Sequence, residues 1–261
     1  LIVFPFGGFF GRGAHFPTTP TEQELYVRYV LARWGAYWNV LWNVSGPEPL
    51  LVKDGNVVLP KSELDRLGRL ITSLDPFGHA ITVHNQTGDD AWLADDWISF
   101  GTLQGPKTTD TALLYAGLLW NHHPARPLYA QETLWSGNKH GHPDYSDREL
   151  RKNAITIVMS AATHNFADNG GPDPAVIGDS SSGFSGSMAL SDRRQWRHNI
   201  VKQVWDMFET LPLHCLRPAP HIVSTGMCLA EAGQQYLIYL PNGGAVSLRL
   251  SNTAHRVQWI N

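Results

Sequence analysis

The stretch that decides the fold is Trp38-Asn39-Val40-Leu41-Trp42-Asn43-Val44-Ser45-Gly46-Pro47-Glu48. Its first seven residues are mostly apolar or aromatic, which is typical of a buried strand. Ser45-Gly46-Pro47 ends that strand abruptly, and a carboxylate, Glu48, follows at once. A second stretch, Pro127–Glu132, has the same form and ends in Glu132. The chain therefore predicts two buried strands that each lead into a glutamate.

Strand-like and helix-like patterns alternate six times along most of the chain. We expect strands at residues 1–10, 38–44, 79–85, 96–101, 127–132 and 163–166, with helices that include 109–120, 147–162 and 196–210. Such alternation predicts βαβ units and a parallel α/β sheet. Polar or aromatic residues follow nearly every strand, which favours a (β/α)8 barrel of the TIM type over an open doubly wound sheet. Neither a G-x-G-x-x-G motif nor a P-loop supports a nucleotide site.

Two helix starts carry the spacing of a capping box, in which a hydroxyl and a carboxylate three residues later satisfy the first backbone N–H groups. These pairs are Thr21 with Glu24, and Ser62 with Asp65. An apolar stripe follows the second pair, made of Leu64, Leu67, Ile71 and Leu74.

The pattern changes near residues 217–220. Two runs with period-2 alternation, Gln235–Leu240 and Ala245–Leu250, flank a Pro-Asn-Gly-Gly turn and predict a β-hairpin. We therefore expect a barrel domain over residues 1–219 and a small all-β domain, a partial β-sandwich, over residues 220–261.

The composition excludes several classes of protein. The 261 residues are 43% hydrophobic and 16% charged, which are values of a globular chain. A net charge of −3 provides no basic surface for nucleic acid or membrane lipid. No apolar run reaches the roughly 20 residues that span a bilayer, and the first residues lack the pattern of a signal peptide. The two cysteines, Cys215 and Cys228, have no metal-site spacing, and their count leaves a disulfide and two free thiols both open.

Three stretches together resemble a known family. Tyr29–Trp42, Asp75–Asn85 and Pro127–Glu132 resemble the apiosidase-like (β/α)8 glycoside hydrolases, and residues 228–244 are similar to the start of the β-sandwich that follows the barrel in that family. The resemblance implies a secreted or periplasmic hydrolase that cleaves a poly- or oligosaccharide. The family has two more strand–helix units before the segment that resembles residues 1–10. We therefore expect a barrel that is incomplete at its N-terminus, with a second copy or a partner segment covering the gap.

Glycoside cleavage needs one carboxyl group to protonate the leaving oxygen and, in a retaining enzyme, a second carboxylate to attack the anomeric carbon. By position in the resembling barrel, Glu48 is the acid/base and Glu132 is the nucleophile. The residues expected to bind substrate are Asn43, His84, Asn85, Gln104, Trp135 and His164.

No metal and no cofactor are expected. The pairs His122-His123 and His140-x-His142 contain metal-ligand residue types, but surface loops often carry such pairs. Two other functions remain open: a non-catalytic carbohydrate-binding protein on a degenerate barrel, and an open α/β esterase. The esterase is disfavoured because the chain has no G-x-S-x-G nucleophile elbow.

Overall fold

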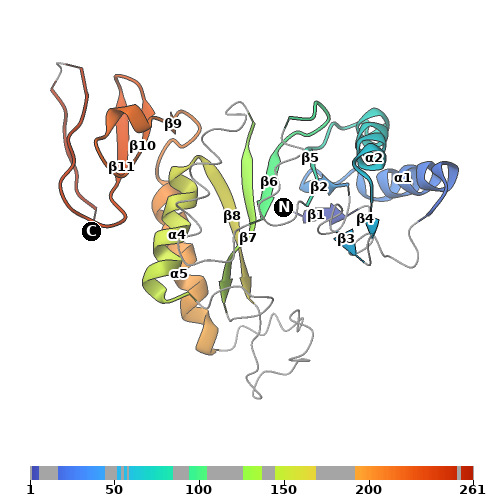
Figure 1. The fold of residues 1–261 in the computed structure, drawn as a ribbon, viewed down its shortest axis with the longest axis horizontal. Coiled ribbons are helices and arrows are strands. Elements are labelled where there is room, and N and C mark those ends of the chain that lie inside the picture. The colour runs from blue at the N-terminus through green and yellow to red at the C-terminus, as the bar shows by residue number, and fades with distance from the viewer. Residues whose placement is uncertain are drawn as a thin grey trace.

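The protein is a mixed α/β chain in which parallel strands and helices are followed by an antiparallel sheet (Figure 1). The structure, a computed structural model, describes residues 2–5, 17–44, 52–53, 56–57, 59–84, 94–104, 126–136, 145–168, 192–251 and 254–260. The α/β class predicted from the alternation of patterns is therefore confirmed. Among the helices in these ranges, none is both long enough and apolar enough to cross a membrane.

The first sheet is parallel and has the order β1-β2-β5. Its strands are β1 (Ile2–Pro5), β2 (Val40–Asn43) and β5 (Ile81–Thr82). Helices α1 (Pro20–Trp34) and α2 (Lys61–Leu74) connect the strands, and a short antiparallel pair, β3 (Val52–Lys53) and β4 (Asn56–Val57), precedes α2. The fully buried Trp42 lies in the core between this sheet and the two helices. The predicted stripe of α2 is confirmed for three residues, since the buried positions include Leu64, Leu67 and Ile71.

The second sheet is also parallel and has the order β6-β7-β8. It contains β6 (Gly101–Gln104), β7 (Leu128–Ser136) and β8 (Ala162–Asp168). Helices α4 (Asp147–Met159) and α5 (Asp192–Glu209) pack against each other and against one face of this sheet (Figure 1).

Hydrogen bonds join the two sheets at β5. The backbone N–H of Ser99 donates to the carbonyl of Ile81 at 2.9 Å, and the hydroxyl of Thr82 donates to the carbonyl of Phe100 at 2.9 Å. Because residues 99 and 100 lead directly into β6, the six strands follow one another in the order of the chain. A doubly wound sheet reverses its strand order at a switch point, and the described strands contain no such reversal.

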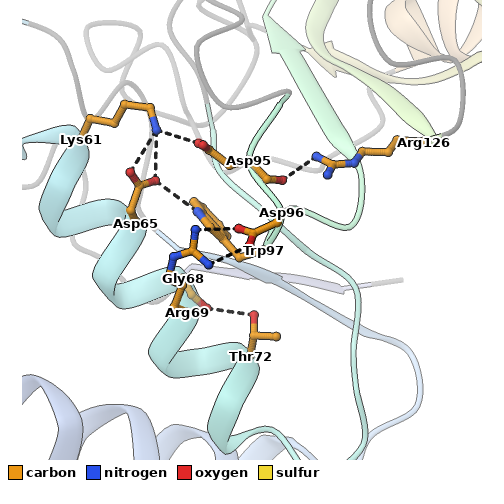
Figure 2. A network of polar contacts seen from close by, with 9 residues as sticks. All are labelled: Lys61, Asp65, Gly68, Arg69, Thr72, Asp95, Asp96, Trp97 and Arg126. Atoms are coloured by element: carbon orange, nitrogen blue, oxygen red, sulfur yellow. Dashed lines mark hydrogen bonds and ion pairs between the residues drawn. The ribbon is translucent and has the colours of Figure 1, made fainter.

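Ion pairs fasten residues 94–100 to α2 (Figure 2). The ammonium of Lys61 lies 2.7 Å from the carboxylate of Asp95, and the guanidinium of Arg69 lies 2.6 Å from that of Asp96. These contacts fix the segment that carries the chain into β6.

Packing of Trp97 strengthens the same attachment. The indole ring lies so close to α2 that a Cβ added at Gly68 would be 2.4 Å from a ring atom of Trp97. The indole Nε1 of Trp97 also donates a hydrogen bond to the carboxylate of Asp65 at 3.1 Å. Arg126, just before β7, donates to the backbone carbonyl of Asp95 at 2.6 Å (Figure 2). The starts of β6 and β7 are therefore held by one set of contacts.

The third sheet is antiparallel and has the order β11-β10-β9. Its strands are β9 (Arg217–Pro218), β10 (Met227–Glu231) and β11 (Gln235–Tyr239), and the short 3-10 helix η2 (Pro220–Ile222) follows β9. Met227 and Leu229 pack against the core of α4 and α5, whereas Cys228 and Ala230 face a separate small core.

The predicted hairpin is wrong in its pairing. Gln235–Tyr239 pairs with Met227–Glu231, and the segment 245–250 contributes only one isolated bridge, from Leu248 to Val223, within the described residues. Gly233, with a φ of +79°, supplies the left-handed residue of the turn between β10 and β11.

The predicted start of α1 is two residues too late. The helix begins at Pro20 after the N-cap Thr19, whose hydroxyl accepts from the backbone N–H of Glu22. Thr19 and Glu22 form the capping box in place of Thr21 and Glu24. Pro20 decides the register because proline suits the first position of a helix, where no N–H is needed.

The capping box predicted for α2 is absent. The helix begins at Lys61, and its N-cap, Pro60, makes no side-chain cap hydrogen bond. The carboxylate of Asp65 is instead bound to Lys61 and to the indole of Trp97. Ser62 and Asp65 have the spacing of a capping box, but Lys61 and Trp97 bind the carboxylate of Asp65.

Two predicted boundaries also differ. Residues 96–100 form turns and bends, and the strand starts at Gly101, because Trp97 and Ile98 are buried against α2 and not in a sheet. The helix predicted over 147–162 ends at Met159, since Ala161 has a φ of 60° and Ala162 begins β8. The helix predicted over 109–120 lies outside the described residues.

Candidate functional site

The two faces of the parallel strands differ in polarity. On one face, paired residues such as Trp42 with Ile81 contribute to the apolar core beneath α1 and α2. Side chains alternate along a strand, so the next pair, Asn43 with Thr82, lies on the other face, and both residues are buried. In β2 and β5, buried polar side chains thus lie on the face that the helices do not cover.

Asn43 and His84 meet at the carboxyl ends of β2 and β5. The backbone N–H of His84 donates to Oδ1 of Asn43 at 3.0 Å, and each residue is only 4% exposed. Both residues were predicted to bind substrate, and they lie in direct contact. Beneath them, the hydroxyls of Thr82 and Thr102 are 2.7 Å apart.

Gln131 completes this cluster from β7. Its Nε2 lies 3.0 Å from Nδ1 of His84. An amide nitrogen only donates, so this hydrogen bond requires Nδ1 of His84 to accept. Gln131 was not among the predicted site residues. No local sequence pattern would have found it, because its partner in the cluster is 47 positions away in the chain.

His84 is electrically neutral at ordinary pH. Burial removes water from the imidazole and lowers the pKa of His84 to about 4, because a desolvated ring resists taking up a positive charge. The cluster therefore offers hydrogen bonds without adding a charge.

The predicted carboxylates are described only in part. Glu48 and Asn85 lie outside the described residues. Glu132 lies in β7, next to a register shift between Ala130 and Leu134, and its side chain is outside the described part of the chain. The same holds for the side chains of Gln104 in β6 and Trp135 in β7.

His164 lies on the face of the second sheet that the helices cover. It pairs with Ala130, which belongs to the core beneath α4 and α5, and its ring centroid is 5.0 Å from that of Trp205 in α5. Burial lowers the pKa of His164 to about 4. The structure does not bring His164 to Asn43 and His84, and its role toward a sugar stays a prediction.

The stretch around Asp75 supports the start of β5. The carboxylate of Asp75 accepts from Nε1 of Trp42 at 2.9 Å and from the backbone N–H groups of Phe77 and His79 at 3.1 and 2.8 Å. Nδ1 of His79 also lies 2.8 Å from this carboxylate. Trp42, Asp75 and His79, which all lie in stretches that carry the family resemblance, are therefore joined on the helix-covered side of the first sheet, and Asn43 lies on the opposite face.

Neither cysteine forms a disulfide, and Cys228 is buried. Within the described ranges, no group of three or more His, Cys, Asp or Glu side chains is arranged to hold a metal ion. His122, His123, His140 and His142 lie outside those ranges.

Two solved structures share the fold. One is a glycoside hydrolase family 5 protein from Bacteroides vulgatus, with 16% identity and a TM-score of 0.59 over 80% of this chain and 51% of that one. The other is described as a glycoside hydrolase, with 17% identity and a TM-score of 0.61 over 81% of this chain and 53% of that one. The chain thus spans about half the length of each.

No protein with a curated description matches the sequence. The family model for the apiosidase-like catalytic domain matches residues 6–167, which is more than half of the chain. The matched residues include the polar cluster of Asn43, His84 and Gln131. Because the match covers more than half of the chain, the chain belongs to the apiosidase-like family of glycoside hydrolases.

Proposed function

We propose that this protein is a glycosidase that cleaves a poly- or oligosaccharide by a retaining mechanism with two carboxylates. The observation that carries the proposal is the convergence of Asn43 and His84, at the carboxyl ends of β2 and β5, with Gln131 of β7, which lies level with the carboxyl end of β6. In α/β folds of this kind, active sites form at that end of the strands. Membership of the family supports the same reaction class.

The scaffold in this proposal is a barrel of the (β/α)8 type. Two observations support it. The six parallel strands follow the order of the chain, and the contact between His84 and Gln131 passes over the intervening strand β6. In such a barrel, inward side chains from alternate strands meet in layers. We assign the parallel strands and their helices, through α5, to this barrel, and the antiparallel sheet that begins with β9 to the small β domain, so the boundary lies slightly before the predicted residue 219.

Glu48 is the acid/base and Glu132 is the nucleophile in the proposed reaction. Glu48 protonates the glycosidic oxygen while Glu132 attacks the anomeric carbon, and water activated by Glu48 then releases the sugar from Glu132. A retaining reaction requires the two carboxyl groups to be about 5 Å apart. Support comes from the strand direction: Glu48 follows β2 in the chain, and Glu132 is the middle residue of β7, one position past the residue that pairs with the end of β6.

Neutral polar side chains suit the binding of sugar hydroxyls. Asn43 and His84 offer hydrogen bonds without a net charge, and the proposal adds Asn85, Gln104 and Trp135 as further substrate contacts. The neutral state of His84 also matters for the acid. A nearby imidazolium would lower the pKa of a carboxylic acid, whereas a neutral ring leaves Glu48 able to hold its proton.

The test is turnover of a panel of aryl glycosides and polysaccharides by the wild type, Glu48→Gln and Glu132→Gln. We expect each variant to lose at least about a thousandfold in kcat/KM while unfolding at the same urea concentration as the wild type. Glu209→Gln, at the exposed end of α5, is the matched control. A fluorosugar inhibitor should label Glu132, as read by peptide mass spectrometry.

Sugar binding without turnover by the wild type would support the non-catalytic carbohydrate-binding alternative and reject the hydrolase. Hydrolysis that survives both substitutions would reject the two-carboxylate assignment.

A further inference from the structure

We infer that Gln131 is a positioning residue for His84: its amide fixes the imidazole in the tautomer that carries the proton on Nε2, and this N–H, which is buried in the structure, becomes a neutral donor to a hydroxyl when a substrate occupies the site. The donation from His84 to a substrate rests on the proposed function. The tautomer of His84 rests only on the contacts of the structure.

The ring of His84 is oriented from β7. Nε2 of Gln131 lies 3.0 Å from Nδ1 of His84, although the two residues are 47 positions apart in the chain. The hydrogen bond made by one ring nitrogen decides whether the other nitrogen can donate or accept. Because the amide donates to Nδ1, Nε2 must be the protonated nitrogen of the neutral ring.

The main chain of His84 is fixed independently from β2. Its backbone N–H donates to Oδ1 of Asn43 at 3.0 Å, and both residues are almost fully buried. With its backbone held by Asn43 and its ring held by Gln131, His84 has little freedom to turn. A donor that is oriented before the substrate arrives loses less entropy on binding than a mobile one.

The place of Gln131 connects this donor to the reaction. It immediately precedes Glu132 on β7, so the strand that carries the proposed nucleophile also carries the group that orients His84. A shift of β7 would therefore move the nucleophile and loosen the donor together. Substrate binding and attack are linked through a single strand.

The first experiment reads the tautomer directly. Long-range ¹H–¹⁵N spectra of the labelled full chain, with the His84 signals identified from their loss in His84→Gln, should show the Nε2–H form in the wild type. Gln131→Met keeps the side-chain volume but removes the donor, so we expect a mixture of tautomers. Gln131→Glu replaces the donor with an acceptor, so the proton should move to Nδ1. Gln234→Met, in the exposed turn after β10, is the control for the change of residue type.

The ring assignment is overturned if the wild type shows the Nδ1–H form, or if the His84 signals are the same in Gln131→Met as in the wild type. If the urea transition shows that Gln131→Met does not fold, Gln131→Glu alone tests the ring assignment. An unchanged Nε2–H signal of His84 in Gln131→Glu would then overturn the assignment.

The second experiment separates positioning from mere packing. On a substrate turned over by the wild type, Gln131→Met should lose about tenfold to a hundredfold in kcat/KM, with most of the loss in KM. Unchanged kinetics in a folded Gln131→Met that shows mixed tautomers would overturn the positioning role. If the wild type turns over no substrate, the proposed function fails, and the tautomer result still tests the ring assignment.

Discussion

The carboxylate of Asp75 accepts a hydrogen bond from the indole of Trp42, 33 positions earlier in the chain, at 2.9 Å. The side chain of Asp75 is only 2% exposed, and it also binds His79 and two backbone N–H groups. One acidic side chain therefore links β2, the end of α2 and the start of β5.

Replacing Asp75 with alanine should lower the free energy of unfolding by about 3 kcal/mol, because the substitution leaves several donors, among them the indole of the buried Trp42, without an acceptor. Urea denaturation followed by tryptophan fluorescence measures the change. Asp206→Ala, which removes an exposed pair with Lys202 on α5, should change stability by less than about 0.5 kcal/mol. Equal effects of the two substitutions would contradict the structural role of Asp75.

The same carboxylate should make stability depend on pH. Burial alone would raise the pKa of Asp75, but hydrogen bonds from Trp42, Phe77 and His79 outweigh burial and hold the pKa below its usual value. A depressed folded pKa stabilises the protein above the unfolded pKa of about 3.9, and this stability is lost as the pH falls through the folded pKa. The stability advantage of the wild type over Asp75→Asn should therefore shrink as the pH falls below about 4. An advantage that stays constant from pH 7 to pH 3 would refute this assignment.

Gly68→Ala should destabilise the protein by about 1–3 kcal/mol, although alanine is the better helix former. The new methyl group would overlap the ring of Trp97, which lies 2.4 Å from the Cβ position. Thermal and urea unfolding both report the effect, and Ser73→Ala on an exposed position of α2 is the control. A gain in stability of the size expected from helix propensity would show that Trp97 moves away at little cost.

Cys228 should resist thiol reagents in the native state. Burial raises the pKa of its thiol to about 11, and only the thiolate reacts. Titration with a chromogenic disulfide reagent should therefore detect Cys228 only after the protein is unfolded, with Cys228→Ala identifying its contribution. Rapid reaction of Cys228 in the native protein would contradict its burial.

Sequence patterns predicted the buried strand at β2 and the apolar stripe of α2, because hydrophobic periodicity reports which side chains face the core. They failed where several local motifs compete. Thr19 and Thr21 both have a glutamate three residues later, and only the position of Pro20 decides between them. The predicted hairpin was wrong for a similar reason. The run 235–240 could pair with the run before it or with the run after it, and it pairs with the earlier run, Met227–Glu231, through the turn at Gly233.

The candidate site was predicted in part. Asn43 and His84 follow apolar strands, which is a pattern visible in the sequence, and the structure joins them. Gln131 was missed because its importance comes from a contact with a ring 47 positions away, which no local pattern reports. Long-range contacts of this kind depend on strand order and curvature.

The contacts of Asp75 bear on how such proteins are classified. Trp42, Asp75 and His79 all lie in the stretches that carry the family resemblance, and their contacts hold β2, the end of α2 and the segment before β5 together. Two chains that share these three residues are thus expected to fold alike even where their substrates differ. The choice of substrate would depend on the side chains at and after the carboxyl ends of the strands.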